Sequence, residues 1–524
     1  MSSILEITAP ALDWMLLSPM VVLFTGAGIG LLVEAFVPRG SRFPVQTGLA
    51  AITIVVAFGL TIYNWSGGQA ELGAEGSLAF DGPTSLFSAL ILLFGLGGLA
   101  LFSDRELGGG VSVFASSVAT VPGSPLEREA ERQHRENTEV FPLLVYSLLG
   151  MVIFVASNNL IVMFVALEIF SLPLYLLTGM ARRRRLLSQE GALKYFLLGA
   201  VASAVFLFGS ALLYGYSGSL YLREIAAALA IGAESNTLLL AGMFMVSVGL
   251  LFKIGVVPFH SWTPDAYTGA PTPVTAFMAA ATKTAAVAAL LRVFYVALGG
   301  ARWDWQPVFA ALAIITMITG AVVALLQTDV KRLLAYSSIT HAGFLLVGVV
   351  GAVAATPETT LSSVAAIAFY MLAYGVATLG AFAVVMTVRR SGGEATSIAA
   401  WRGIGRTNPV VASVMTLFLL SFAGIPPTAG FAGKLVVFSS AWAGGYGWLV
   451  LVAVVMSVVA AFLYLKLIVA MWFTDPDPEQ QAEVEPSGIG TLSVLVIAAL
   501  TTIALGLLPG GFLDLAEQAA QFIR

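Results

Sequence analysis

The chain has 524 residues, of which 58% are apolar, whereas 25 Lys+Arg and 29 Asp+Glu together make up only 10%. Soluble domains carry about 25% charged residues, so this composition excludes a water-soluble protein of this size. The chain has no cysteine and three histidines, which excludes disulfides and cysteine-ligated clusters and leaves little room for haem or zinc. We therefore expect no metal and no redox cofactor in this chain. The net charge of −4 gives no sign of a nucleic-acid partner.

Apolar segments of about 20 residues recur along the chain, which is typical of a bundle of membrane-spanning helices. Windows of about 19 residues predict fourteen spans. They cover residues 14–36, 44–64, 81–103, 140–157, 159–180, 189–216, 236–258, 274–297, 307–326, 333–353, 359–388, 408–441, 446–473 and 488–509. An even number of spans places both termini on the same side of the membrane. Acidic rather than basic residues precede the first span, so we interpret it as a retained helix and not as a signal peptide.

The loops between these spans differ strongly in basic charge. One set carries sixteen Lys and Arg, including the run Arg182 to Arg185, whereas the opposite set carries three. Basic loops stay in the cytoplasm, so we expect both termini outside. Two of the cytoplasmic loops are unusual. Residues 104–139 form a polar insertion. The acidic stretch 475–485 is either a solvated linker, which we favour, or a contact with another subunit.

Five of the six lysines fall inside predicted spans, namely Lys194, Lys253, Lys283, Lys434 and Lys466. A charge at the bilayer centre costs roughly 2.5 to 3.5 kcal/mol on insertion scales, so such residues usually face the bundle interior and serve a function. Lysine changes its protonation readily on burial, and it can therefore load and release a proton. Glu168, in the middle of the fifth span, offers the opposite charge at a similar depth. Arg292 lies near the outer end of the eighth span, where we expect its side chain to snorkel.

Glycine and proline interrupt the seventh and twelfth spans. The interrupting residues are Gly255 and Pro258 in the first case and Gly424, Pro426 and Pro427 in the second. Proline removes a backbone donor and clashes with the preceding turn, and a break at membrane depth is tolerated only where it is buried in protein or lines a wet cavity. Paired interrupted spans indicate an inverted-repeat transporter. Because the breaks are five spans apart, we expect repeats of spans 4–8 and 9–13, although the lysines lie at unequal distances from their prolines.

Other polar residues in the spans allow two interpretations each. Glu190 and Lys194 are spaced i, i+4 at the start of the sixth span, which puts them on one helical face as a relay or as an interfacial ion pair. His341, in the tenth span, is either a packing group or part of a proton relay. His260, beside the first break, either joins the relay or caps a freed carbonyl. Lys466, in the thirteenth span, is either a late relay site or part of a structural ion pair.

Several strings resemble the antiporter-like subunits of respiratory complex I. They are Leu167 to Tyr175, Ala192 to Phe196, Phe252 to Asp265, Leu333 to Ile339 and Gly424 to Pro427. The resemblance covers the whole chain apart from residues 104–139, and it is closest to the subunit N branch of the family. The L branch would carry a long lateral helix after the last span, and the M branch carries glutamate where Lys434 stands here.

The resemblance implies an all-α polytopic membrane protein with fourteen helices, two inverted five-helix repeats and two broken helices, spans 7 and 12. We divide the chain into a three-helix segment (1–103), the insertion (104–139), the two repeats (140–298 and 299–473), and the acidic loop with the final helix (474–524). The implied function is proton translocation in a bacterial plasma membrane. The implied partners are the lipid bilayer and the other membrane subunits of the complex, with NAD, FMN, iron–sulfur clusters and quinone held in partner subunits.

The resemblance also implies individual roles. Glu168 is the acidic partner of Lys253, Lys283 is the connecting lysine on the eighth span, and Lys434 is the site of the second half. Two other functions stay open at this point. One is a subunit of a multisubunit sodium/proton antiporter, and the other is a structural scaffold whose lysines pair with neighbouring subunits.

Overall fold

The structure, a computed structural model, describes residues 12–68, 70–116, 124–133, 136–232, 235–354, 361–390, 393–477, 479 and 481–523. The predicted placement of the two termini concerns Met1 and Arg524, and both lie outside the described residues. Part of the 104–139 insertion also lies outside them. The described part is almost entirely helical.

Twelve helical segments of the described residues are long and apolar enough to cross a membrane. Eleven of them are α1 (Trp14–Phe36), α2 (Arg39–Ser66), α3 (Gly82–Phe102), α6 (Leu160–Thr178), α7 (Arg185–Ser217), α9 (Thr237–Ile254), α13 (Arg302–Leu326), α14 (Val330–Gly351), α15 (Ser363–Thr387), α19 (Gly447–Phe473) and α20 (Ile489–Leu507). The twelfth runs from Thr272 to Ala297 and contains α11 (Thr272–Phe277), α12 (Lys283–Arg292) and two π-helical turns, Met278–Thr282 and Val293–Ala297. The chain is therefore a polytopic membrane protein.

Two of the fourteen predicted spans contain shorter apolar helices. Span 4 is α5 (Val140–Ala156), with 17 residues, and span 12 holds two helices of 15 residues each, α17 (Pro409–Ala423) and α18 (Ala429–Ala443). A helix needs about 20 residues to cross the hydrocarbon core unaided. The remaining helices are short: α4 (Pro125–Arg132), α8 (Leu222–Ile231), α10 (Trp262–Gly269), α16 (Ile404–Thr407) and α21 (Gly510–Gln518).

Five short strands form two small antiparallel sheets in the described part. The first pairs β1 (Glu71–Gly73) with β2 (Leu78–Phe80), and the second places β3 (Val388–Arg390) between β4 (Gly393–Glu394) and β5 (Glu483–Val484). β5 belongs to the acidic stretch 475–485, so two residues of this stretch pair with β3, whereas Asp475 at its start is 86% exposed. The stretch is held by opposite charge, since Arg389 Nε lies 2.9 Å from Glu485 Oε2.

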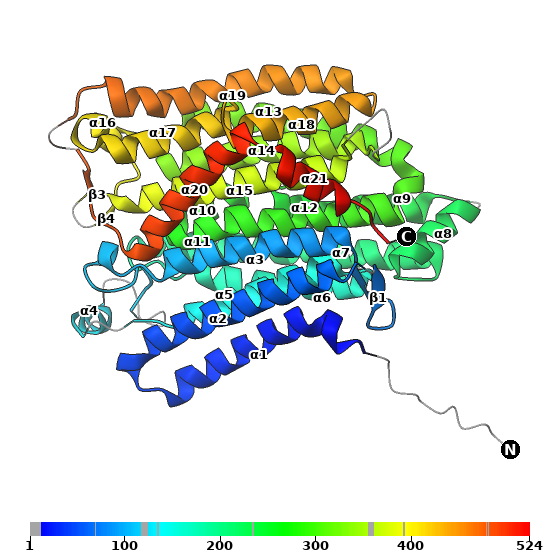
Figure 1. The fold of residues 1–524 in the computed structure, drawn as a ribbon, viewed down its shortest axis with the longest axis horizontal. Coiled ribbons are helices and arrows are strands. Elements are labelled where there is room, and N and C mark those ends of the chain that lie inside the picture. Colours follow the sequence, from blue (N-terminus) through cyan, green and yellow to red (C-terminus); the bar gives the residue numbers. More distant parts are fainter. Residues whose placement is uncertain are drawn as a thin grey trace.

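The long helices lie roughly parallel, with α1 at one edge of the bundle and α19 at the other (Figure 1). The β3–β4 hairpin and α4 lie at one end of the bundle, and β1 and α8 lie at the opposite end (Figure 1). The segment 272–297, α14 and α15 form the centre of the bundle. In the most apolar 18-residue stretch of each, 94 to 100% is buried inside the protein, compared with 33% for α1 and 22% for α20. Polar side chains on these central helices are therefore enclosed by protein rather than by lipid.

The two Gly/Pro segments have the same local backbone. Gly255 follows α9 with φ +85°, and Gly424 follows α17 with φ +81°. Each glycine N–H binds two carbonyls of the preceding turn, those of Leu251 and Phe252 in the first case and those of Leu420 and Ser421 in the second. A left-handed residue after a helix favours glycine because it lacks Cβ. The helix of span 7 therefore ends at Ile254, four residues before the predicted boundary.

The expectation that Arg292 snorkels is wrong. Its side chain is fully buried, and its guanidinium donates to both carboxylate oxygens of Asp81, at 2.6 and 3.0 Å. It also donates to the carbonyl of Val155 at 2.9 Å and to the hydroxyl of Thr84 at 2.6 Å. Asp81 caps the start of α3 and accepts the N–H of Ile523 at 3.1 Å. A buried charge of opposite sign lies within reach, so the guanidinium pairs inside the protein.

Candidate functional site

Lys253 lies in the last turn of α9, with its amine enclosed by aromatic rings. Its side chain is buried, and Nζ lies 3.4 Å from the hydroxyl of Tyr175. The ring centres of Phe170, Tyr175, Tyr195 and Phe252 lie 5.1 to 5.7 Å from Nζ. Cation–π contacts of this kind contribute about 0.5 to 2 kcal/mol each to holding a charged amine. The site therefore accepts the ammonium form without a carboxylate in contact.

Glu168 lies on α6, two helical turns before Tyr175. Its Oε1 is buried and has no hydrogen-bond partner among the described residues. Among the described residues no ion pair joins it to Lys253, whose amine contacts Tyr175 and the aromatic rings instead. Buried oxygens in proteins normally have a hydrogen-bond partner. The free Oε1 of Glu168 is explained if it accepts a mobile proton or a water molecule.

Lys283 is the first residue of α12 and directly follows the π-helical turn 278–282. Its buried amine donates to both the carbonyl oxygen and the hydroxyl of Ser338 on α14, each at 2.6 Å. It also lies 5.3 Å from the ring centre of Tyr374. π-Helical turns inside α-helices occur frequently at functional sites. The turn sets the register in which Lys283 faces α14.

His341 lies one turn after Ser338 on α14, and both of its ring nitrogens have hydroxyl partners. Nδ1 lies 2.5 Å from the hydroxyl of Tyr370, and Nε2 lies 3.1 Å from that of Tyr464. The Tyr464 hydroxyl also lies 2.5 Å from the hydroxyl of Ser337. A neutral imidazole donates from one nitrogen and accepts at the other. A proton can therefore enter this ring on one side and leave on the other.

Lys434 lies on α18, and its amine reaches back across the break to the end of α17. Nζ donates to the carbonyls of Phe422 at 2.8 Å and Ala423 at 2.9 Å, and to the hydroxyl of Ser457 at 2.8 Å. The last carbonyls of a helix lack intrahelical partners and carry partial negative charge. A cavity of about 10 Å³, with His341 and Phe422 among its lining residues, lies beside these groups. That volume holds about one water molecule.

Glu190 and Lys194 belong to a separate network at the surface of the bundle. Lys194 Nζ lies 2.6 Å from Glu190 and 2.9 Å from Asp265, and Asp265 lies 3.0 Å from Arg332. These side chains are 26 to 56% exposed. The geometry is that of an interfacial ion pair extended to four groups. Sequence reasoning missed Asp265 and Arg332, because the contacts join three different helices.

Two more of the predicted residues also lie apart from the buried lysines. Lys466 is exposed, and its amine donates to the carbonyls of Leu325 and Gln327, each at 2.9 Å, at the end of α13. His260 is half-buried in the connector between α9 and α10, and its Nδ1 has no hydrogen-bond partner among the described residues. Among the described residues, neither side chain forms a hydrogen bond with Lys253, Lys283 or Lys434.

The central helices thus bring Lys283, His341 and Lys434 close together, since Tyr374 lies against the first two and Phe422 against the last two. Lys253 lies among side chains of α6, α7 and α9. Sequence reasoning missed five buried tyrosines that contact these residues: Tyr175 and Tyr195 at Lys253, Tyr374 at Lys283 and His341, and Tyr370 and Tyr464 at His341. The available signal was a tyrosine inside an apolar span, where its hydroxyl needs a partner. Within the described part of the chain, no group of three or more His, Asp or Glu is placed to hold a metal ion.

Comparisons with known proteins place the chain in one family, and the relatives match nearly its full length. Residues 157–460 match the family described as NADH:quinone oxidoreductase/Mrp antiporter, TM. NADH-quinone oxidoreductase subunit N of Cutibacterium acnes is 53% identical, over 100% of this chain and 98% of that protein. A chain of respiratory complex I from Thermus thermophilus is 33% identical, with a TM-score of 0.74 over 95% of this chain and 98% of that one. A chain of the Mrp complex from Dietzia, at 22% identity and a TM-score of 0.78 over 97% and 96%, shares the fold.

Proposed function

The chain belongs to the NADH:quinone oxidoreductase/Mrp antiporter family, and on that premise we propose that it is a proton-translocating membrane subunit of an NADH:quinone oxidoreductase. The observation that carries this proposal is the row of buried polar groups through the centre of the bundle. Lys283 binds Ser338, His341 lies one turn further on α14, and Lys434 lies beyond the small cavity next to His341. Buried charges of this kind are costly and serve ion paths in membrane proteins.

In this proposal Lys253, Lys283 and Lys434 hold protons in series across the middle of the membrane. His341 carries a proton between the last two, through Tyr464 or Tyr370 on either side of its ring. Water joins Lys253 to Lys283. The oxygen atoms that hold Lys283 and Lys434 are serine hydroxyls and neutral carbonyls, so neither amine is fixed in its charged form by a carboxylate.

Glu168 is the switch in this mechanism. When its carboxylate is close to Lys253, it favours the ammonium form; when the contact is open, the buried amine gives its proton to water and on to Lys283. The unpartnered Oε1 of Glu168 and the contact of Lys253 with Tyr175 support the open arrangement as the one described here.

We further propose two inverted repeats, residues 140–298 and 299–473, each with one discontinuous helix. The shared glycine geometry at Gly255 and Gly424 supports this assignment. So does the position of the second lysine, because Lys434 binds the carbonyl of Phe422, and Phe422 precedes Gly424 by two residues as Lys253 precedes Gly255. The breaks would open wet half-channels from opposite faces. With the basic loops in the cytoplasm, both termini would lie outside.

Energy for transport comes from other subunits in this proposal. The neighbouring membrane subunits contact this chain, and NAD, FMN, iron–sulfur clusters and quinone are bound elsewhere in the complex. Redox chemistry there drives the movement of Glu168 relative to Lys253. The competing function, a sodium/proton antiporter subunit, is supported by the fold shared with the Mrp complex, but the 53% identity to subunit N over the full length favours the oxidoreductase.

The test is Lys253→Met in the assembled complex, reconstituted in proteoliposomes. We expect the number of protons moved per NADH oxidised to fall, because the first proton-holding amine is gone. Lys466→Met is the matched control, since this lysine is exposed and binds only carbonyls at the end of α13. An unchanged proton yield in Lys253→Met would exclude the proposed path. Proton uptake driven by Na⁺ in vesicles without NADH would instead support the antiporter.

A further inference from the structure

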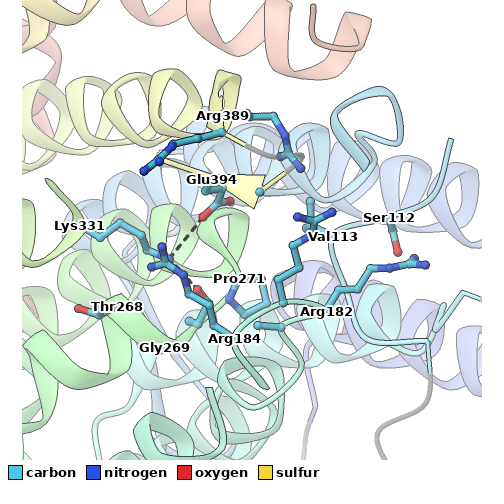
Figure 2. Close-up of a pocket in the computed structure, with 15 residues that line it drawn as sticks. Ser112, Val113, Arg182, Arg184, Thr268, Gly269, Pro271, Lys331, Arg389 and Glu394 are labelled. Carbon is cyan, nitrogen blue, oxygen red and sulfur yellow. Dashed lines mark hydrogen bonds and ion pairs between the residues drawn. The ribbon is translucent and has the colours of Figure 1, made fainter. Parts of the chain in front are cut away.

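A second polar site lies at the end of the bundle that carries the β3–β4 hairpin. It is a pocket of about 400 Å³, formed by residues 112–113, 181–184, 268–271, Lys331 and the hairpin itself (Figure 2). Six cationic side chains line it, those of Arg182, Arg183, Arg184, Lys331, Arg389 and Arg390, whereas Glu394 is the only acidic one among the lining residues. The volume is within the range of about 300 to 1,000 Å³ of small-molecule sites.

Contacts within the protein neutralise part of this positive charge. The amine of Lys331 donates to the carbonyl of Ala270 at 2.7 Å and lies 4.0 Å from Glu394, whose other contact is the hydroxyl of Thr272 at 2.6 Å. Arg389 pairs with Glu485 at 2.9 Å. Glu394 and Glu485 thus each contact one of the six cations.

Two of the other arginines contact neutral oxygens. Arg184 donates to the hydroxyl of Thr396 at 2.9 Å, and Arg390 donates to the main-chain carbonyl of Glu479 at 2.5 Å. Arg182 differs from these two, because its Nη1 is buried and has no hydrogen-bond partner among the described residues. Figure 2 shows Arg182 and Arg184 on the wall of the pocket that faces Arg389 and Glu394. A buried guanidinium nitrogen without an acceptor indicates a missing anionic partner.

The pocket also adjoins the apolar surface of the bundle. Arg182 to Arg184 directly precede α7, whose side chains Leu186 and Leu193 are 72% and 57% exposed. An amphiphile could therefore place its acyl chains along α7 and its headgroup among the arginines. Basic pockets at the cytoplasmic ends of membrane helices bind anionic headgroups in this way.

We propose that this pocket binds a phosphate group, carried by an anionic phospholipid headgroup or free in the cytoplasm. Arginine suits this role because its planar guanidinium offers paired donors to phosphate oxygens. The bound group would link the loop before α7 to Lys331 on α14 and to the β3–β4 hairpin. The pocket is distinct from the proposed proton path, since the amines of Lys253, Lys283 and Lys434 bind other residues than those that line it.

The test compares the complex that contains this chain with a double variant, Arg182→Gln/Arg184→Gln. Arg39→Gln/Arg402→Gln is the control, because it removes the same charge from basic residues that do not line the pocket. The probes are phosphatidylglycerol or phosphatidylcholine, added to the delipidated complex in detergent, and inorganic phosphate alone. Native mass spectrometry counts the bound lipid, and equilibrium dialysis measures the phosphate. A third variant, Arg182→Lys/Arg184→Lys, keeps the charge, and thermal unfolding identifies any variant that fails to fold.

We expect the glutamine variant to bind its ligand about tenfold more weakly or worse, since two charge-assisted contacts are lost. We expect the lysine variant to retain most binding and the control to match the parent. Loss confined to phosphatidylglycerol identifies the headgroup as the source, and loss confined to inorganic phosphate identifies the free ion. Equal binding of every probe by the glutamine variant and the control overturns the proposal. So does loss of an associated protein subunit without any change in lipid or phosphate.

Discussion

The amine of Lys434 on α18 donates a hydrogen bond to the carbonyl of Phe422 on α17, at 2.8 Å. Phe422 precedes Gly424 by two residues, and Lys253 precedes Gly255 by two residues. Lys253 therefore belongs to the last turn of α9, the helix before the first break. Lys434 belongs to α18, the helix after the second break, and its amine reaches back to the last turn of α17. Lys434 contacts the partially negative carbonyls at that helix C-terminus, whereas the amine of Lys253 lies among aromatic rings. The unequal lysine spacing in the sequence thus hides a similar placement of the two lysines relative to the breaks.

Gly424→Ala should disturb Lys434 specifically. An alanine here would hold φ near +81° with its Cβ 2.9 Å from Cδ of Lys434. We expect a loss of stability of about 1 kcal/mol or more from the left-handed backbone, together with a lower proton yield per NADH as the lysine is displaced. Denaturant unfolding and proton pumping in proteoliposomes measure the two effects.

Gly445→Ala is the control for this substitution. Gly445 has φ +86°, and a Cβ added there would meet nothing within 4 Å. The two variants should therefore share the loss of stability, and only Gly424→Ala should pump less. Equal pumping by both would mean that the position of the Lys434 amine does not matter.

The family, the membrane location and most helix positions were predictable from the sequence, and the family prediction is confirmed by the match over residues 157–460 and by the relatives. These features depend on apolar runs and on glycine and proline, which act locally. The partners of the charges were not predictable. Arg292 and Asp81 are 211 positions apart, and Lys283 and Ser338 are 55 apart. Their contacts depend on how the helices pack, and a hydropathy window carries no information on that.

Tyr464→Phe should weaken the link at His341. The substitution removes the hydroxyl that lies 3.1 Å from His341 Nε2 and 2.5 Å from Ser337. We expect slower pumping and a loss of roughly 1 to 3 kcal/mol in the free energy of unfolding, because two internal hydrogen bonds of about 0.5 to 1.5 kcal/mol each are removed. Tyr214→Phe, on the exposed face of α7, should alter neither. Normal pumping in Tyr464→Phe would leave Tyr370 as the sole hydroxyl route through His341.

Asp265→Asn tests whether the surface network is structural. Asp265 contacts Lys194 at 2.9 Å and Arg332 at 3.0 Å, with all three side chains partly exposed. Exposed ion pairs contribute about 0 to 1 kcal/mol, so we expect the free energy of unfolding to fall by no more than that. The difference should shrink as salt is raised, because salt screens exposed charges. Proton yield per NADH should stay unchanged; a clear decrease would make Asp265 and Lys194 part of the path.

The buried pair of Arg292 and Asp81 should be the most sensitive structural contact outside the proposed path. Replacing Arg292 with methionine leaves a buried carboxylate without its cation, and breaking a buried pair costs about 3 to 5 kcal/mol. We expect a similar loss for Asp81→Leu, which strands the guanidinium. The double variant Arg292→Met/Asp81→Leu should recover much of that stability, since neither charge is then left alone in the protein. A double-mutant cycle of unfolding free energies in mild detergent measures the coupling. Two single losses that simply add would show that the carboxylate and the guanidinium do not stabilise each other.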